Sequence, residues 1–329
     1  MRLRVSGHDV VERHFRQEYG EVADASAGDV EVDVRFAPVG GALPGRPVIV
    51  GGHKSVGWRV ALSAPDARPL TAVIELRGRP LSFALSLVQG YFVEPLVSIA
   101  SARAGEVLVP SAALAGTDGV LLLVGASRSG KSSLAARGIA AGWTVLGDDQ
   151  VFLDGRGRCR SFPRRMRFYC DLPLVAPRAY AVLPRRLRAE LGWRRAMRVL
   201  TRGYVRPSLP VSPRVFGQQH PAGAVPLGRV VVLERSDRVE ALTVVGADRS
   251  AVVATTERLL EQQRERVSAA GDDRWRGAID AARRAEADVL SGALDGRPLE
   301  RLLVPGRWEA ARAVAELARA LGIEPDAGR

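Results

Sequence analysis

Two short stretches hold the residues best suited to chemistry: GASRSGKS at 125–132, and the acid pair Asp148-Asp149 shortly after it. The first fits the phosphate-binding (Walker A, or P-loop) pattern G-x-x-x-x-G-K-[ST] at every position. In such a loop backbone N–H groups converge on phosphate oxygens, the lysine contacts the β- and γ-phosphates, and the serine hydroxyl binds Mg²⁺. We therefore expect ATP and Mg²⁺ to bind at Gly125, Ala126, Ser127, Arg128, Ser129, Gly130, Lys131, Ser132 and Ser133.

The spacing between loop and acid pair indicates where the carboxylates lie. A helix of about 11 residues spans roughly 16 Å, enough to return the chain for a parallel strand at 143–147. Asp148 and Asp149 then leave that strand at the edge of the sheet from which the loop also emerges. We expect Asp148 to act as general base and Asp149, with Ser132, to bind the metal, although the sequence does not order the two acids. The alternative is that one or both carboxylates only cap a turn.

This arrangement, GASRSGKS followed by a helix and then GWTVLGDD, resembles the HPr serine kinase/phosphorylase family. SFPRRMRF at 161–168 is similar to the F-P-R segment of that family, and PLGRVVVLERSD at 226–237 is similar to the strand that closes its core. The resemblance covers roughly residues 105–235. It implies an α/β fold shared with phosphoenolpyruvate carboxykinases, in which the nucleotide lies over a mixed sheet. It also implies catalytic roles for Lys131, Asp148 and Asp149, and a phosphate contact for Arg164, whose alternative is an ordinary surface arginine.

One departure from the family is Pro110, which stands where many members carry a histidine on the strand before the loop. Proline transfers no proton, so we expect neither the dual kinase/phosphorylase activity nor HPr itself as the substrate. The strand-rich segment ahead of the core resembles kinases associated with lasso peptide biosynthesis, which phosphorylate a serine of a ribosomally made precursor peptide. The first hypothesis is thus an ATP- and Mg²⁺-dependent serine kinase. The alternatives are a kinase of a small hydroxylated metabolite and a non-catalytic nucleotide-binding regulator.

Composition indicates the environment and the partners. The chain has 329 residues, a net charge of +12, and lysine at only two positions, Lys54 and Lys131. Cys159 and Cys170 stand in no metal-ligand pattern, and the first residues lack the apolar core of a signal peptide, so we expect a cytoplasmic protein without a membrane segment. Residues 156–206 hold 15 arginines against two acids. This run indicates either a plain solvated face or a surface for an acidic partner, such as an acidic peptide or a phosphate-bearing ligand. Nucleic acid is not favoured, and a homo-oligomer remains open.

Three regions follow from the pattern of apolar residues. Residues 1–104 hold short alternating strands and then a buried helix at 81–105, which predicts a β-rich N-terminal domain. Residues 105–240 form the predicted nucleotide-binding core. Residues 241–329 show a 3.6-residue period, which predicts a helical C-terminal region packed on that core.

Overall fold

The computed structural model describes residues 2–20, 29–36, 48–204, 207–221, 223–269 and 272–323. The chain forms two compact units, each built from two segments. The first unit is Met1–Leu108 with Glu257–Leu290, and the second is Val109–Thr256 with Ser291–Arg329. The chain passes between the units within β6 (Glu106–Val109), α8 (Arg249–Ser268) and α9 (Asp273–Ala293).

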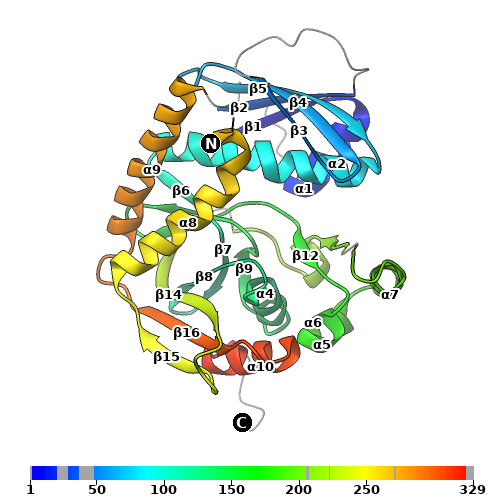
Figure 1. Cartoon of the computed structure of the whole chain (residues 1–329). Coiled ribbons are helices and arrows are strands. Elements are labelled where there is room, and N and C mark those ends of the chain that lie inside the picture. The colour runs from blue at the N-terminus through cyan, green and yellow to red at the C-terminus, as the bar shows by residue number, and fades with distance from the viewer. Residues whose placement is uncertain are drawn as a thin grey trace. The chain divides into compact units, whose positions relative to one another are not determined.

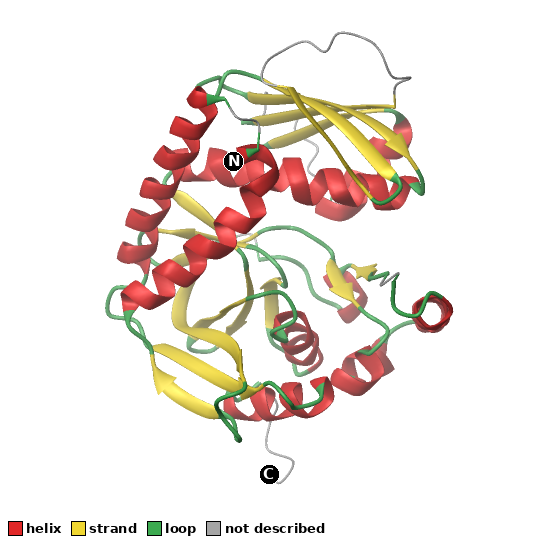
Figure 2. Ribbon diagram, in the orientation of Figure 1, coloured by secondary structure: helices red, strands yellow, loops and turns green. Residues whose placement is uncertain are grey.

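The first unit is built on a five-stranded mixed sheet of order β1-β2-β5-β4-β3. Its strands are β1 (Leu3–Gly7), β2 (Val30–Phe36), β3 (Val48–His53), β4 (Val56–Leu62) and β5 (Leu70–Gly78). β1, β2 and β5 are parallel, whereas β4 is antiparallel to β3 and β5. Burial alternates along β5, so one face of the sheet carries apolar side chains that need a cover. Figure 2 shows helices against this sheet.

The helices of the first unit confirm one prediction and add a helix that the sequence did not reveal. A continuous helical stretch runs through α2 (Leu81–Val88), a π-helical turn (Gln89–Val93) and α3 (Glu94–Arg103), as the apolar spacing predicted. α1 (Asp9–Tyr19) was not expected; it buries Val11 and Phe15 on one face and begins at His8, whose Nδ1 accepts the N–H of Val10. The sequence of α1 is short and mostly polar, so the helical spacing of its few apolar residues does not stand out.

A buried ion pair joins α8 and α9 within the first unit. Arg264 and Glu286 are each 1% exposed and bond to one another, and Arg264 also donates to Ser98 Oγ of α3 over 2.7 Å. Because a buried charge without a partner is costly, this group fixes how the three helices pack.

Among the described residues one helical stretch, Leu81–Arg103, is long and apolar enough to cross a membrane by length and composition alone. Two thirds of its most apolar window is buried inside the protein, as in many core helices. This stretch is weak evidence either way on a membrane.

The second unit contains the larger mixed sheet, in which neighbours follow the order β10-β11-β14-β8-β7-β9 and β16 and β15 continue from β14. Figure 1 shows β14, β16 and β15 side by side. Its strands are β7 (Ser111–Gly116), β8 (Gly119–Gly125), β9 (Thr144–Gly147), β10 (Val151–Asp154), β11 (Arg158–Ser161), β14 (Val225–Ser236), β15 (Thr243–Gly246) and β16 (Leu299–Pro305). β8, β14 and β16 are parallel, and β7 is antiparallel to β8 and β9. A two-stranded sheet pairs β12 (Met166–Phe168) with β13 (Leu209–Val211).

The order of these strands corrects one expectation. β9 was expected as the parallel strand after the helix, and it does run in the direction of β8, but β7 lies between them. The helix crossing therefore skips one strand position. The carboxyl ends of β8 and β9 still meet the same edge of the sheet.

The prediction of a helical region from 241 to 329 is wrong at two places. β15 and β16 lie inside it, and β16 pairs with β14 from Val230↔Leu299 to Ser236↔Pro305. LERLLVP is only seven residues long, and its strand form comes from a partner more than 60 positions away, which no local pattern reveals.

Helices of the second unit cover the large sheet, and three of them, α5, α6 and α7, follow β12 in the chain. They are α4 (Lys131–Ala140), α5 (Leu172–Val175), α6 (Pro177–Val182), α7 (Arg185–Leu200), a 3-10 turn at Pro213–Phe216, and α10 (Ala310–Ala320). One core cluster joins side chains of α4, α10 and the sheet with Leu183 and Leu191, which lie before and within α7. The core thus extends from the sheet into the arginine-rich segment.

Leu302→Ala tests whether β16 belongs to this core. Leu302 is 1% exposed, so the truncation leaves a cavity and should lower the free energy of unfolding by about 2–4 kcal/mol. The matched control is Leu174→Ala, the same chemical change at a side chain 68% exposed, which should change stability by less than about 0.5 kcal/mol. Chemical denaturation measures both, and equal losses would show that β16 lies outside the core.

Candidate functional site

The glycine-rich loop joins the end of β8 to the start of α4. Gly130, the residue before the helix, has φ +107°, a conformation that a residue with a side chain adopts only with strain. No side chain caps the first turn of α4, so its N–H groups are available to a ligand. The positive end of the helix dipole lies at the same place, which favours an anion.

Lys131 is folded back over this loop. Its Nζ donates to Gly125 O over 2.5 Å and to Ala126 O over 3.0 Å, and in the described part of the chain no carboxylate forms an ion pair with it. Burial lowers the pKa of the Lys131 ammonium, while Asp149 and Asp148 act in the opposite direction. An ammonium held only by two carbonyls can turn to a phosphate without breaking an ion pair.

Ser129 provides an independent sign that the loop fits an anion. Its side chain is buried, and its Oγ has no hydrogen-bond partner among the described residues. A buried hydroxyl without a partner costs free energy, and a phosphate oxygen at the loop is a group that it could bond. Ala126, Ser127 and Arg128 are exposed, and Ser132 and Ser133 are half-buried on the first turn of α4.

The acid pair lies in the tight turn between β9 and β10. A Cβ on Gly147 would lie 2.0 Å from Gln150 O, so only glycine allows the chain to turn here. The turn gives the two carboxylates different surroundings: Asp148 is 2% exposed, and the Asp149 side chain is 51% exposed. They are thus two chemically distinct groups.

Asp148 is held by a backbone donor from β12. Its Oδ2 accepts the N–H of Arg167 over 2.9 Å. Burial raises the pKa of Asp148 to about 6, and the charge of Asp149 adds to the rise; the Arg167 N–H and the guanidiniums of Arg164 and Arg167 oppose it. A carboxyl group with that pKa is mostly ionised at neutral pH and accepts a proton more readily than an ordinary aspartate.

Arg164 joins the site through Asp149. The Nη1 of Arg164 lies 2.7 Å from Asp149 Oδ2, and the Arg164 side chain is only 14% exposed. Arg164 is therefore not an ordinary surface arginine. In this structure it contacts the carboxylate expected to bind metal, and its contact with a phosphate stays a prediction.

Two residues at this site were not singled out by the sequence. Arg167 acts through its backbone N–H, which leaves no trace in residue types. Tyr169 follows β12; burial raises the pKa of its hydroxyl, and Asp149 raises it further. The run SFPRRMRFY could have indicated Tyr169, since it continues the segment that carries Arg164.

Pro110 lies at the same edge of the sheet. It precedes Ser111, which is opposite Val124, the residue before the loop's first glycine. The position where relatives of the resembled family carry histidine is thus occupied here by a residue without a donor or an acceptor on its side chain.

The donors around the loop fit a magnesium–nucleotide complex better than a metal held by protein alone. Across the described residues, no group of three or more His, Cys, Asp or Glu side chains gathers to hold a metal ion. Mg²⁺ usually takes one or two carboxylates together with substrate phosphates and water. Asp149, with its half-exposed carboxylate, and Ser132 match that limited role.

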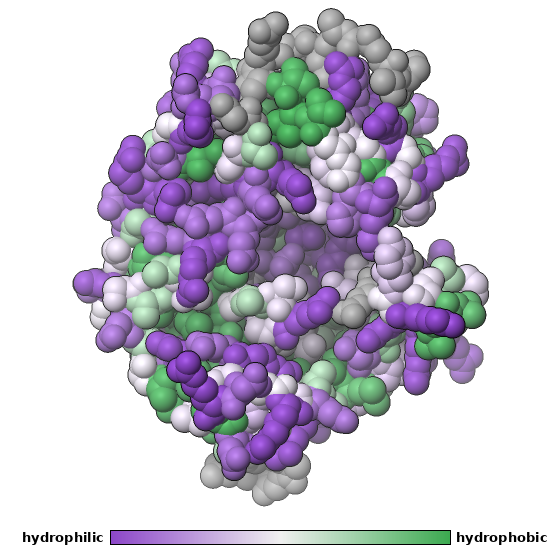
Figure 3. All heavy atoms as spheres, viewed as in Figure 1, coloured by the Kyte–Doolittle hydropathy of each residue, from purple (hydrophilic) through white to green (hydrophobic). Residues whose placement is uncertain are grey.

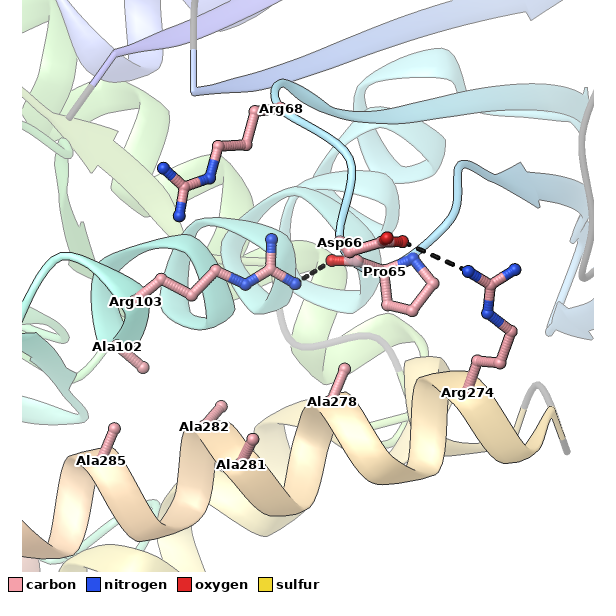
Figure 4. A pocket seen from close by; sticks show the side chains of 10 residues that line it. All are labelled: Pro65, Asp66, Arg68, Ala102, Arg103, Arg274, Ala278, Ala281, Ala282 and Ala285. Carbon is pink, nitrogen blue, oxygen red and sulfur yellow. Dashed lines mark hydrogen bonds and ion pairs between the residues drawn. The ribbon is translucent and has the colours of Figure 1, made fainter.

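A cavity of about 510 Å³ lies in the first unit and contains none of these residues (Figure 4). Its lining is Pro65, Asp66, Arg68, Ala102, Arg103, Arg274, Ala278, Ala281, Ala282 and Ala285. Arg103 donates to Pro65 O, and Arg274 pairs with Asp66 over 3.5 Å. These contacts tie the cavity wall together, and no titratable pair with the chemistry of Asp148 and Asp149 lines it.

Comparison with known proteins adds no relative: no model of a protein family matches the chain, and no curated protein is similar to it. The chemistry of the site must therefore be argued from its own residues.

The raised pKa of Asp148 predicts that Asp148→Asn stabilises the protein at neutral pH. The folded chain holds this proton more tightly than the unfolded chain, so the free energy of unfolding falls as pH rises from about 4 to about 6. Asparagine keeps an acceptor for the Arg167 N–H and removes the buried charge, which should add up to about 3 kcal/mol at pH 7.5. Thermal unfolding should show the gain at pH 7.5 and its loss at pH 4.

Asp118→Asn is the matched control, since Asp118 is exposed. It should leave the stability unchanged at both pH values. A gain for Asp148→Asn that is equally large at pH 4 would contradict a raised pKa.

Proposed function

We propose that this protein is an ATP- and Mg²⁺-dependent kinase that phosphorylates a serine hydroxyl of a peptide. The observation that carries the proposal is the meeting, at one edge of one sheet, of a phosphate-binding loop and a buried carboxyl group with a pKa of about 6. Carboxyl groups whose pKa is strongly shifted by burial cluster at functional sites, which supports a role for Asp148 beside this loop.

The residues of the loop would hold the donor nucleotide. The N–H groups at the start of α4, the Ser129 hydroxyl and the Lys131 ammonium are the groups available to its phosphates. When bound, Mg²⁺·ATP supplies the phosphoryl group and neutralises part of its charge. Ser132 and Asp149 would bind the metal, and the ion pair with Arg164 holds Asp149 in position.

Asp148 would accept the proton of the acceptor hydroxyl. Its Oδ2 is fixed by the Arg167 N–H, which orients the carboxylate and leaves Oδ1 for the acceptor. Phosphoryl transfer needs little covalent chemistry from the protein, so positioning and charge account for most of the catalysis. The burial of Asp148 and the exposure of Asp149 support giving the two acids these different roles.

The acceptor class rests on the resemblance to peptide-modifying kinases and on charge. Residues 156–206 follow the acid pair directly and carry 15 arginines. A segment with this charge attracts an acidic peptide more strongly than a small neutral metabolite.

Loss of transfer in two variants tests the proposal. The protein is incubated with ATP, Mg²⁺ and serine-containing peptides encoded next to its gene, and mass spectrometry records a gain of about 80 Da, one phosphoryl group. Lys131→Ala and Asp148→Asn should each reduce the rate at least about 100-fold. Lys54→Ala, which changes the other lysine of the chain, should leave the rate unchanged.

Each outcome decides between the hypotheses. If the Asp148→Asn variant still adds the phosphoryl group at the normal rate, then Asp148 is not the general base. ATP binding without transfer to any peptide would contradict the peptide kinase and favour a metabolite acceptor or a nucleotide-dependent regulator.

The pH dependence of transfer provides a second test. Because the ionised form of Asp148 is the active one, kcat/KM should fall about tenfold per pH unit below pH 6. Arg164 opposes the rise in the pKa of Asp148, so Arg164→Gln should move this inflection to higher pH. A profile flat from pH 5 to pH 8, measured by initial rates, would exclude Asp148 as the base.

A further inference from the structure

The helix α7 presents most of its surface to solvent. It is anchored through Leu191, which is buried in the core cluster, and through Leu187, which packs partly against that cluster. Arg198 also contacts Cys170 Sγ over 3.4 Å. In the described part of the chain Leu191 is the only fully buried side chain of this 16-residue helix, so most of α7 has no partner.

Beyond Arg185 at its start, one stripe of the exposed surface of α7 is apolar, which is unusual for an exposed helix. Trp193, Val199 and Leu200 are 64%, 70% and 74% exposed. They fall on one stripe with three small exposed residues, because positions 189, 192, 193, 196, 199 and 200 repeat at intervals of three and four. We call this face, made of Ala189, Gly192, Trp193, Ala196, Val199 and Leu200, the α7 stripe.

Exposed apolar groups concentrate around this helix. Seven of the eleven large apolar side chains exposed in the described part of the chain lie between Tyr169 and Tyr204. Figure 3 shows apolar and strongly polar spheres side by side over the segment that holds α7. An apolar patch rimmed by charge is typical of a binding surface.

Arginines border the α7 stripe on both sides. Arg188 and Arg195 lie four residues before Gly192 and Val199 on one side of the stripe. Arg186 lies three residues before Ala189 on the other side. The helix carries six arginines and one acid, Glu190, which pairs with Arg194 of α7 itself over 2.5 Å. The borders of the stripe are therefore positive, and no acid of α7 is left to balance them.

Charge selects the occupant of this surface. A second copy of the chain would bring arginine borders against arginine borders, which opposes pairing of two α7 helices. A lipid surface is less suitable, because half of the stripe is alanine and glycine and adds little apolar area to insert. An acidic amphipathic helix matches both features, with apolar residues on the stripe and carboxylates on its borders.

We propose that α7 is a docking site for an acidic, amphipathic segment of the peptide substrate, separate from its phosphorylated serine. This rests on the proposed kinase function for the identity of the peptide, but the binding surface itself does not depend on catalysis. The segment 161–168, which carries Arg164 and the N–H donor to Asp148, leads into α5, α6 and α7. Docking on α7 would raise the local concentration of the serine at the acid pair.

Selection from a random peptide library tests the docking site with the full-length protein. Peptides of 15 residues are displayed, selected on Lys131→Ala protein to prevent turnover, and counter-selected on Trp193→Ala/Leu200→Ala. Enriched sequences should place Leu, Ile, Val or Phe at intervals of three and four, with Asp or Glu between them. Absence of any enriched sequence would overturn the proposal.

The affinity of the enriched peptide for variants of α7 shows how much apolar contact and how much charge each contribute to binding. By fluorescence anisotropy, Trp193→Ala/Leu200→Ala and Arg188→Glu/Arg195→Glu should each weaken binding at least about tenfold. Arg238→Glu and Val244→Ala, at an exposed arginine and an exposed valine outside this segment, should change it less than about twofold. Circular dichroism and unfolding curves establish that the α7 variants fold, and equal binding by variants and controls would overturn the proposal.

Other occupants give distinct results. If the protein binds vesicles of phosphatidylserine and phosphatidylcholine more tightly than the selected peptide, and this binding depends on Trp193, then the partner of the α7 stripe is a lipid surface and not a peptide. If the protein dimerises in analytical ultracentrifugation and this depends on Trp193, then the partner of the α7 stripe is a second copy of the chain. If the protein binds the peptide but transfers no phosphate, the docking site stands and the kinase proposal is wrong. If the α7 variants leave transfer unchanged, the kinase proposal stands and the docking site is wrong.

Discussion

The buried carboxylate of Asp148 is the constraint on which the rest of the site depends. A charge that is 2% exposed must be supported, and here one backbone N–H, from Arg167, provides the direct hydrogen bond. That bond fixes β12 close to the acid pair, and the same segment brings Arg164 to Asp149. Burial in this arrangement raises the pKa of Asp148 to about 6. A carboxyl group with that pKa suits proton transfer at physiological pH.

The glycine-rich loop and the acid pair both lie in the second unit. β8 and β9 run in one direction with β7 between them, so the phosphate-binding loop and the acid pair leave the sheet at one edge. The arginine-rich segment then leads away from that edge to α7. Under the two proposals, recognition and chemistry are separate: the exposed helix α7 would bind the partner, while the edge of the sheet would hold the reacting groups.

The sequence predicted what local pattern determines. The loop motif, the helix after it and the helical stretch at 81–103 all follow from residue types at fixed spacing. It missed β16, whose strand form depends on β14, and the position of β7 between β8 and β9, because both are long-range pairings. It also missed the role of Arg167, since a backbone N–H is the same for almost every residue. The acid pair was recognisable; the unequal burial of its members was not.

The most direct test of this account is the pKa of Asp148, measured by carbon-13 NMR on aspartate-labelled protein and assigned with Asp148→Asn. The account predicts a midpoint near pH 6, which moves upward in Arg164→Gln. A midpoint for Asp148 at or below the ordinary aspartate pKa of 3.8 would contradict the central claim, because the buried carboxyl would then be an ordinary acid.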